Sequence, residues 1–241
     1  MGKRSHNTFQ KKDPDLNAKP QYPSLTKDNI DKIENKVHED KKYGEDLKEL
    51  SNFFTQFPTN TNRDIVIHKI LLVDFTNSTN LKFTSSRVED FSIYKLAEQL
   101  IEWNIDKGIE NGDPTIVDKI SHFCESNIFS FATKYCCYHN TLCYNKDDYS
   151  IFDRVVVKTL PQYIDISPTY IDAEKEKGYS HYHNIISDLI DVYELNNIDK
   201  IRRKIDHFLW FPNKDRGKDK KQQKKNKESS SSADLFANNN D

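Results

Sequence analysis

Residues 128–153 read IFSFATKYCCYHNTLCYNKDDYSIFD, an apolar stretch with helical periodicity that a lysine, Lys134, interrupts. Asp153 lies 19 residues later (153 − 134), after the apolar Phe152 and before RVVVKTL, which has the periodicity of another helix. An aspartate in this position is typical of an N-cap, whose carboxylate accepts hydrogen bonds from the first amides of the following helix. The stretch therefore predicts two helices, one with a lysine in its apolar face and one capped by an aspartate.

Most of the remaining chain consists of further segments with helical periodicity, bounded by Asn, Asp, Pro or polar loops. Apolar residues recur every three or four positions from Thr26 to Phe57, with Thr26 or Asp28 as a start signal. We interpret residues 64–75, apolar on nearly every face, as a buried helix rather than a strand because no other strands appear. The other helical segments are SIYKLAEQLIEWNI, DPTIVDKISHF, IFSFATKYCCYHN, DRVVVKTLPQYI, SHYHNIISDLIDVYEL and NIDKIRRKIDHFLWF. The pattern predicts an all-α bundle of about eight helices.

The two ends of the chain differ from its middle. Residues 1–25 are polar and contain proline, and residues 214–241 (KDRGKDKKQQKKNKESSSSADLFANNND) have too little apolar surface to offset the entropy of ordering. We therefore expect one folded domain over residues 26–213 between two disordered tails. The lysines of the second tail could hold a nucleic-acid backbone loosely, although such a tail more often only improves solubility.

Composition excludes several classes of protein. The 36 basic and 38 acidic residues leave a formal net charge of −2, which says little about partners. No apolar run approaches the roughly 20 residues of a membrane span, and the amino terminus lacks the apolar core of a secretory signal. We expect a cytoplasmic protein with no membrane partner.

Four cysteines, Cys124, Cys136, Cys137 and Cys143, fall in one region of the chain. Their spacing fits neither a zinc site nor an iron–sulfur cluster. Cys136 and Cys137 are adjacent and would point to different sides of a helix, which favours buried free thiols. We expect no metal and no cofactor.

Lys134 and Asp153 are the candidate chemical groups. An amine beside helix amides and apolar walls loses some preference for its charged form, and such a lysine can attack an electrophilic carbon and form a Schiff base. Simpler interpretations are that Lys134 is a surface lysine with a partly buried stem and that Asp153 is only an N-cap.

The segment resembles the catalytic region of the helix-hairpin-helix DNA glycosylase superfamily, which includes endonuclease III and 8-oxoguanine glycosylase. In that superfamily, a lysine at the start of the hairpin's second helix is followed after about 18 to 20 residues by an aspartate that caps the next helix; Lys134 and Asp153 match this arrangement. The resemblance implies that Lys134 is the nucleophile on the deoxyribose C1′. It also implies that Asp153 assists deprotonation and stabilises the developing oxocarbenium charge.

A second match lies in HKILLVDFTNSTNLKF, where the superfamily carries an apolar helix ending in a polar turn that fills the gap left by a flipped base. Asn77, Ser78, Thr79 and Asn80 are the positions that fit. The sequence departs from the superfamily in its hairpin, because residues 128–132 lack the glycines that let backbone amides approach a DNA phosphate. It also lacks the cysteine cluster that some members carry after the aspartate.

Tyr135 and His139 are further candidates for contacting an extruded base, because aromatic rings can stack on a base and hold it outside the duplex. Arg202, Arg203 and Lys204 we interpret as the solvent-exposed side of an amphipathic helix. Trp210 we expect to anchor the last helix in the core.

The resemblance implies a monomeric DNA glycosylase, with or without AP-lyase activity, that flips and excises a damaged or modified base from double-stranded DNA. Base-excision repair and defence against modified viral DNA are both compatible with this chemistry, and in a prokaryote the protein would be associated with the nucleoid. The alternative is a non-catalytic helical protein that keeps the glycosylase fold to bind DNA or a protein partner.

Overall fold

The computed structural model describes residues 9–12, 14, 22–81, 84, 91–125 and 127–214 of the chain. In these residues it contains eleven α-helices and two 3-10 helices, and the one β contact is an isolated bridge between Lys11 and Ile164. The helices are α1 (Lys27–Glu39), α2 (Tyr43–Gln56), α3 (Arg63–Asn77), α5 (Ile93–Glu102), α6 (Ile105–Glu110), α7 (Thr115–Ser121), α8 (Phe129–Tyr144), α9 (Arg154–Thr159), α10 (Pro168–Glu176), α11 (Tyr179–Val192) and α12 (Ile201–Trp210), with 3-10 turns η1 (Leu160–Gln162) and η2 (Phe211–Asn213). The all-α class is therefore confirmed.

The expected number of about eight helices is too low, because the apolar periodicity did not indicate two short helices, α6 and α10. The predicted segment SIYKLAEQLIEWNI is broken at Asn104, whose left-handed φ of 47° separates α5 from α6. Helix α10 was not predicted, although Ser167 and Pro168 carry its start signal: the Ser167 hydroxyl accepts a hydrogen bond from the Tyr170 amide.

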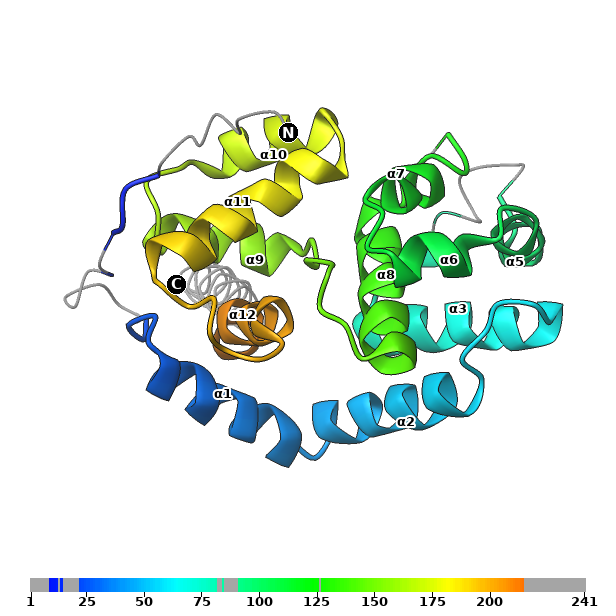
Figure 1. Cartoon of the computed structure of the whole chain (residues 1–241), viewed down its shortest axis with the longest axis horizontal. Helices are drawn as coiled ribbons and strands as arrows, with labels where there is room; N and C mark the ends of the chain where they lie inside the picture. Colours follow the sequence, from blue (N-terminus) through cyan, green and yellow to red (C-terminus); the bar gives the residue numbers. More distant parts are fainter. Residues whose placement is uncertain are drawn as a thin grey trace, which may run out of the picture.

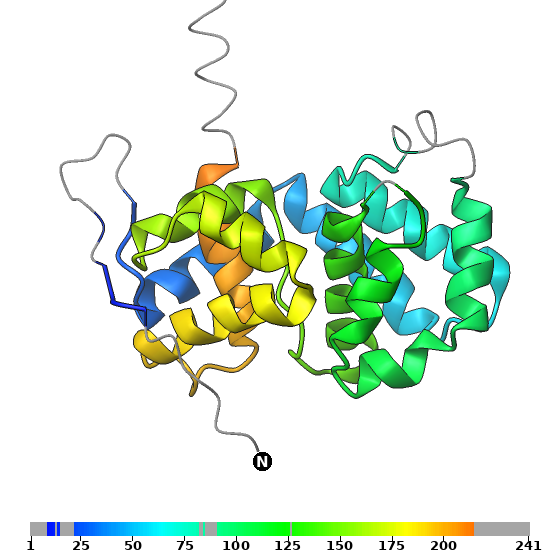
Figure 2. The same ribbon diagram turned by 90° about the horizontal axis from the view of Figure 1, so that it is seen from above.

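The helices form two groups that lie side by side (Figures 1 and 2). One lobe contains α2, α3 and α5–α8, and the other contains α1 and α9–α12. The chain crosses between the lobes at the α1–α2 turn and again in the segment that joins α8 to α9. Residues on that second crossing are therefore positioned between the lobes.

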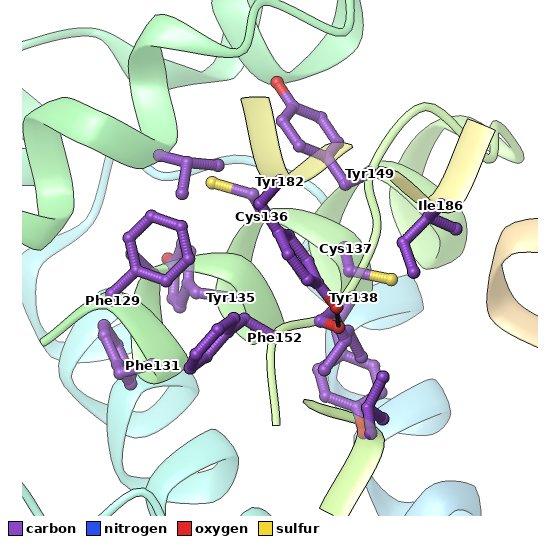
Figure 3. Close-up of a cluster of buried hydrophobic side chains, with 14 of the residues drawn as sticks. Phe129, Phe131, Tyr135, Cys136, Cys137, Tyr138, Tyr149, Phe152, Tyr182 and Ile186 are labelled. Carbon is purple, nitrogen blue, oxygen red and sulfur yellow. Dashed lines mark hydrogen bonds between the residues drawn. The ribbon is translucent and has the colours of Figure 1, made fainter. Parts of the chain in front are cut away.

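Helix α8 is the central helix of its lobe. Every residue from Phe131 to Asn140 is buried, so the helix has no solvent face and its apolar residues surround it. Figure 3 shows its side chains packed with those of the following segments, among them Phe129, Phe131, Tyr135, Cys136, Cys137, Tyr138, Tyr149, Phe152, Tyr182 and Ile186. The cluster joins α8 to α11 and to the segment before Asp153.

The four cysteines are free thiols, and Cys136 and Cys137 are buried as the sequence suggested. Burial raises the pKa of Cys136 well above its ordinary value and that of Cys137 to about 12. These two thiols are packing groups.

Part of the predicted amino-terminal tail is packed on the second lobe. The Lys12 amide donates a hydrogen bond to the Tyr163 carbonyl at 2.8 Å, and the Phe9 ring meets the Tyr170 ring edge-on. Leu25 is buried as well. Residues 9–12 and 22–25 are therefore ordered, although the whole of residues 1–25 was expected to be disordered. Their contacts join residues too distant in sequence for any local pattern to indicate. The other residues of that range and residues 215–241 lie outside the described residues.

Among the described helices, none is both long enough and apolar enough to cross a membrane.

Candidate active site

A cavity of about 210 Å³ lies where the two lobes meet. Both lobes contribute to its walls: Tyr43, Thr76, Asn77, Ser78 and Lys134 come from one, and Ile151, Asp153, Val155, Asp206 and Trp210 come from the second crossing and the other lobe. A larger, mostly apolar hollow of about 730 Å³ between α3 and α5 includes neither Lys134 nor Asp153 in its lining. The smaller cavity is the candidate site because it holds the paired charges.

Lys134 is the sixth residue of α8 and is only 4% exposed, so it is not a surface lysine. Its Nζ lies 3.1 Å from Asp153 Oδ2 and donates a longer hydrogen bond, at 3.5 Å, to the Asn77 carbonyl. The amine therefore reaches the cavity wall with a carboxylate as its main partner.

Asp153 is the N-cap of α9, as predicted. Its Oδ1 accepts a hydrogen bond from the Val155 amide at 2.7 Å, which leaves Oδ2 facing Lys134. One carboxylate oxygen thus fixes the side chain on a helix end while the other meets the amine.

Two hydroxyl groups in the first turns of α8 hold the segment before Asp153. The Ser130 hydroxyl donates to the Phe152 carbonyl, and the Thr133 hydroxyl accepts from the Phe152 amide, both at 3.1 Å. Ser130 and Thr133 precede Lys134 on the same helix, and they hold the backbone of Phe152, the residue before Asp153. These bonds therefore keep Asp153 close to the lysine. Sequence reasoning missed both residues, since their partners lie about 20 positions away.

The polar turn after α3 has one side at the cavity. Asn77 and Ser78 line it, and Ser78 adopts a left-handed conformation with φ 50°. The Thr79 hydroxyl instead donates to Asp74, and Asn80, also left-handed, is exposed. Of the four positions predicted here, the structure brings the first two to the cavity and leaves Thr79 and Asn80 beside it.

Tyr135 and His139 do not reach the cavity. The Tyr135 hydroxyl donates to Asn60 at 2.7 Å, and His139 Nε2 lies 3.2 Å from Asp106, in a buried network on another side of α8. The expectation that these rings contact an extruded base is therefore not supported. Their helix is buried on all sides, so periodicity could not indicate which side faces a ligand.

This buried network contains a second arrangement that invites a chemical interpretation. His139 lies between Asp106 and Cys143, with 3.6 Å between its Nδ1 and the thiol, in the order of a carboxylate, a base and a nucleophile. However, burial raises the pKa of Cys143 to about 11 and lowers that of His139. The thiol therefore stays protonated near neutral pH, and the arrangement is a structural network.

Helix α12 contributes residues that sequence reasoning assigned to solvent. Arg203 is buried: it donates to Asp206 Oδ2 at 2.6 Å and to the Tyr138 hydroxyl at 3.2 Å. The Tyr138 hydroxyl in turn donates to the Asn77 side chain at 2.8 Å. The prediction of an exposed basic face was wrong for Arg203, because α12 packs against both α1 and α9, whereas Arg202 and Lys204 are half-buried.

Six residues that line the cavity were not predicted as site residues, namely Tyr43, Thr76, Ile151, Val155, Asp206 and Trp210. Burial raises the pKa of Asp206 to about 6, although the charge of Arg203 opposes the rise. Trp210 is only partly buried and packs against the Tyr43 ring, with 4.7 Å between ring centroids. It anchors the last helix as expected, and it also forms part of the cavity wall.

Among the described residues, no group of three or more His, Cys, Asp or Glu side chains is placed to hold a metal ion.

Fold and site together define an all-α protein of two helical lobes with a buried lysine–carboxylate pair between them. Residues 29–147, just under half of the chain, match the family model HI_0787_N, described as an N-terminal domain. The match includes Lys134 and ends before Asp153. The chain is also similar to an "Uncharacterized protein" of Haemophilus influenzae, with 26% identity over 130 residues, which are 52% of this chain and 59% of that protein. No solved structure matches the chain.

Proposed function

We propose that the protein is a DNA glycosylase that excises a damaged or modified base, with Lys134 as nucleophile and Asp153 as its carboxylate partner. The observation that carries this proposal is the 3.1 Å contact between the Lys134 amine and Asp153 Oδ2 at the wall of a cavity between the lobes. Nucleophilic catalysis by lysine requires an amine at a cavity with a proton acceptor within hydrogen-bonding reach, and this pair meets both requirements.

The arrangement of helices supports a likeness to the helix-hairpin-helix glycosylases. Helix α7 packs against α8, the next helix in the chain, which carries Lys134, and the aspartate caps the following helix, α9. The likeness to that superfamily is part of the proposal, as are the double-stranded DNA partner and the monomeric state.

The proposed chemistry begins as the base departs with the electrons of the C1′–N bond. The carboxylate of Asp153 faces the positive charge that develops on the sugar, and it is placed to take the proton that the Lys134 ammonium must lose. Nζ then bonds to C1′, and the departed base takes the proton that the Asp153 carboxyl holds. The C1′–O4′ bond breaks as a proton moves from Nζ to O4′, which opens the sugar and leaves a protonated Schiff base. Loss of a C2′ proton from that intermediate would eliminate the 3′ phosphate, which is the lyase reaction.

The turn after α3 suits a contact with the opened duplex. Asn80 and Ser78 are exposed polar residues in left-handed conformations, next to the cavity residue Asn77. Such short side chains could enter the gap that a flipped base leaves in the stack.

The test is borohydride trapping on duplexes that carry oxidised, deaminated, alkylated or glucosylated bases, or a plain abasic site. We expect covalent protein–DNA adducts from the wild type and none from Lys134→Gln. Lys69→Gln is the matched control, because Lys69 is also a buried lysine and burial lowers its pKa to about 8, but it does not line this cavity. Adducts that persist in the Lys134 variant and vanish in the Lys69 variant would contradict the proposal.

The rival proposal is a non-catalytic helical protein that binds DNA or a protein partner. It is favoured by the absence of glycine from residues 128–132, because side chains there keep backbone amides further from a phosphate. On this proposal the Lys134–Asp153 contact is a structural ion pair, and the wild type gives no adduct and releases no base from any duplex.

A further inference from the structure

The α12 wall of the cavity carries two residues, Asp206 and Trp210, that the lysine chemistry does not use. They are four positions apart on one helix, so their side chains lie on the same face. The wall therefore presents a carboxylate and an aromatic ring together, opposite the lobe that holds Lys134.

The Asp206 carboxylate is held by one of its two oxygens. Oδ2 accepts from Arg203 at 2.6 Å, and Arg203 is itself fixed over the Tyr138 ring, 4.8 Å from its centroid. Within the described residues, Oδ1 accepts no hydrogen bond, and the Asp206 side chain is only 9% exposed. Oδ1 is not among the fully buried atoms that lack a partner, so a ligand or water in the cavity can supply the hydrogen bond that this acceptor lacks.

The size and the aromatic wall of the cavity limit what could meet that oxygen. About 210 Å³ is smaller than the pockets that take drug-sized ligands, so the cavity admits a small group such as one base and not a duplex. Trp210 and Tyr43, whose ring centroids are 4.7 Å apart, place two aromatic side chains in the cavity wall, which suits contact with a flat heteroaromatic base.

We propose that Asp206 reads the extruded base by accepting a hydrogen bond from an N–H group on its edge, while Trp210 packs against the ring. The ligand class is a base whose edge presents an N–H donor, and a base that presents only acceptors is repelled by the carboxylate. This inference rests on the proposed glycosylase function and adds the residue that sets specificity.

The experiment measures single-turnover release of bases from pairs of duplexes that differ by one donor. The first pair is 8-oxoguanine with 8-oxohypoxanthine, which lacks the 2-amino group and keeps its ring N–H donors. The second pair is uracil with 3-methyluracil, in which a methyl group replaces the hydrogen of the imide N–H. For at least one pair, we expect the wild type to release the donor-bearing base about tenfold to a hundredfold faster, the usual range for a hydrogen bond to a buried charged group.

Asp206→Asn gives the decisive comparison. The amide oxygen must turn to Arg203, which can only donate, so the NH₂ group faces the cavity. The preference for the donor-bearing base should then disappear or reverse. Asp147→Asn is the matched control, because burial also raises the pKa of Asp147 to about 6, but its carboxylate binds the amides of Arg202 and Arg203 outside the cavity. This variant should keep the wild-type preference, and circular dichroism reports whether each variant folds.

Three results would overturn the assignment. The first is that the wild type releases both members of every pair at equal rates, a result that does not depend on whether Asp206→Asn folds. The second is that a folded Asp206→Asn variant keeps the wild-type preference. Release of no base from any pair, while the wild type still forms adducts with an abasic duplex, would also count against Asp206 as the reader of these edges. Absence of abasic-site adducts from the wild type would instead reject the glycosylase function itself.

Discussion

At the scale of single residues, the two oxygens of Asp153 separate two roles that can be tested independently. Asp153→Asn keeps an acceptor for the Val155 amide and removes the charge beside Lys134, whereas Asp153→Ala removes both. We expect both variants to lose at least about a hundredfold in adduct formation, as is typical when a catalytic proton acceptor is removed.

The same pair of variants should differ in stability. The alanine variant should be less stable than the asparagine variant by about 1 kcal/mol, the usual contribution of an N-cap, which corresponds to about 2–4 °C in Tm for a domain of this size. Thermal unfolding followed by circular dichroism measures the difference. Equal Tm values would mean that the cap contributes nothing, and full activity of the asparagine variant would remove Asp153 from the chemistry.

His207 should make the protein sensitive to mild acid. Burial and the nearby charge of Arg203 lower the pKa of His207 to about 4, while Nδ1 stays 2.7 Å from Glu34. Burial raises the pKa of Glu34, but its hydrogen bond and charge interaction with His207 outweigh this and lower it to about 2. Above about pH 4 a neutral His207 donates to an ionised Glu34, and at lower pH the protonated His207 supplies the charge that lowers the pKa of Glu34.

The unfolded chain therefore binds a proton on His207 more tightly than the folded protein does. The contribution of neutral His207 to the stability of the folded protein is complete above the ordinary pKa of 6.5, and it is lost as the pH falls from 6.5 towards 4. Over that range we expect the wild type to lose up to about 3 kcal/mol more than His207→Gln. The pKa values of Asp147 and Asp206 are raised to about 6, so these two groups make the folded protein more stable as the pH falls. Comparison of the wild type with His207→Gln cancels their contribution. Urea unfolding at several pH values measures this, and parallel curves would contradict the assignment.

At the scale of elements, helix α8 connects two polar networks through tyrosines on different sides. The Tyr138 hydroxyl links Asn77 to Arg203 beside the cavity, and the Tyr135 hydroxyl serves the network around Asn60. Each change to phenylalanine removes a buried hydrogen bond, while Asn60 keeps its bond from Lys69 and Arg203 keeps its bond to Asp206, so each should cost about 1 kcal/mol in urea unfolding.

Only Tyr138→Phe should affect the chemistry, because Asn77 contacts the Lys134 amine through its carbonyl. We expect adduct formation to slow about tenfold in this variant, which corresponds to a loss of one hydrogen bond in the transition state. Tyr135→Phe is the control, because it should lose a similar amount of stability without slowing adduct formation. Equal slowing in both variants would show that the effect arises from general destabilisation.

At the scale of the whole molecule, the amino-terminal segment stabilises the second lobe. Residues 9–12 reach Tyr163, Ile164 and Tyr170, and the Tyr193 hydroxyl donates to the Lys12 carbonyl at 2.8 Å. Deletion of residues 1–14 should lower stability by about 1–3 kcal/mol, since it removes several hydrogen bonds and a ring contact. Deletion of residues 1–8 keeps all of these contacts and is the control. Calorimetry compares the two, and equal Tm values would mean that the segment contributes nothing.

The sequence by itself determined the features that depend on local chemistry. Thr26 begins α1, the Asp113 side chain accepts from the Thr115 amide at the start of α7, and Asp153 caps α9, as expected from the hydrogen bonds that these side chains offer to nearby amides. The all-α class followed from periodicity, and the spacing from Lys134 to Asp153 indicated which charges to examine.

Only the tertiary structure decided which side chains meet at the cavity. Tyr43 and Arg203 are 160 positions apart and share a hydrogen bond, and no local pattern contains that contact. Helix α12 shows an amphipathic pattern, but the pattern does not say that Arg203 and Asp206 would be buried where the helix packs against α1 and α9. For the same reason Tyr135 and His139 lie in a buried network, whereas Asp206 and Trp210 face the cavity: periodicity orients a side chain about its own helix, and packing between distant segments decides what that side chain meets.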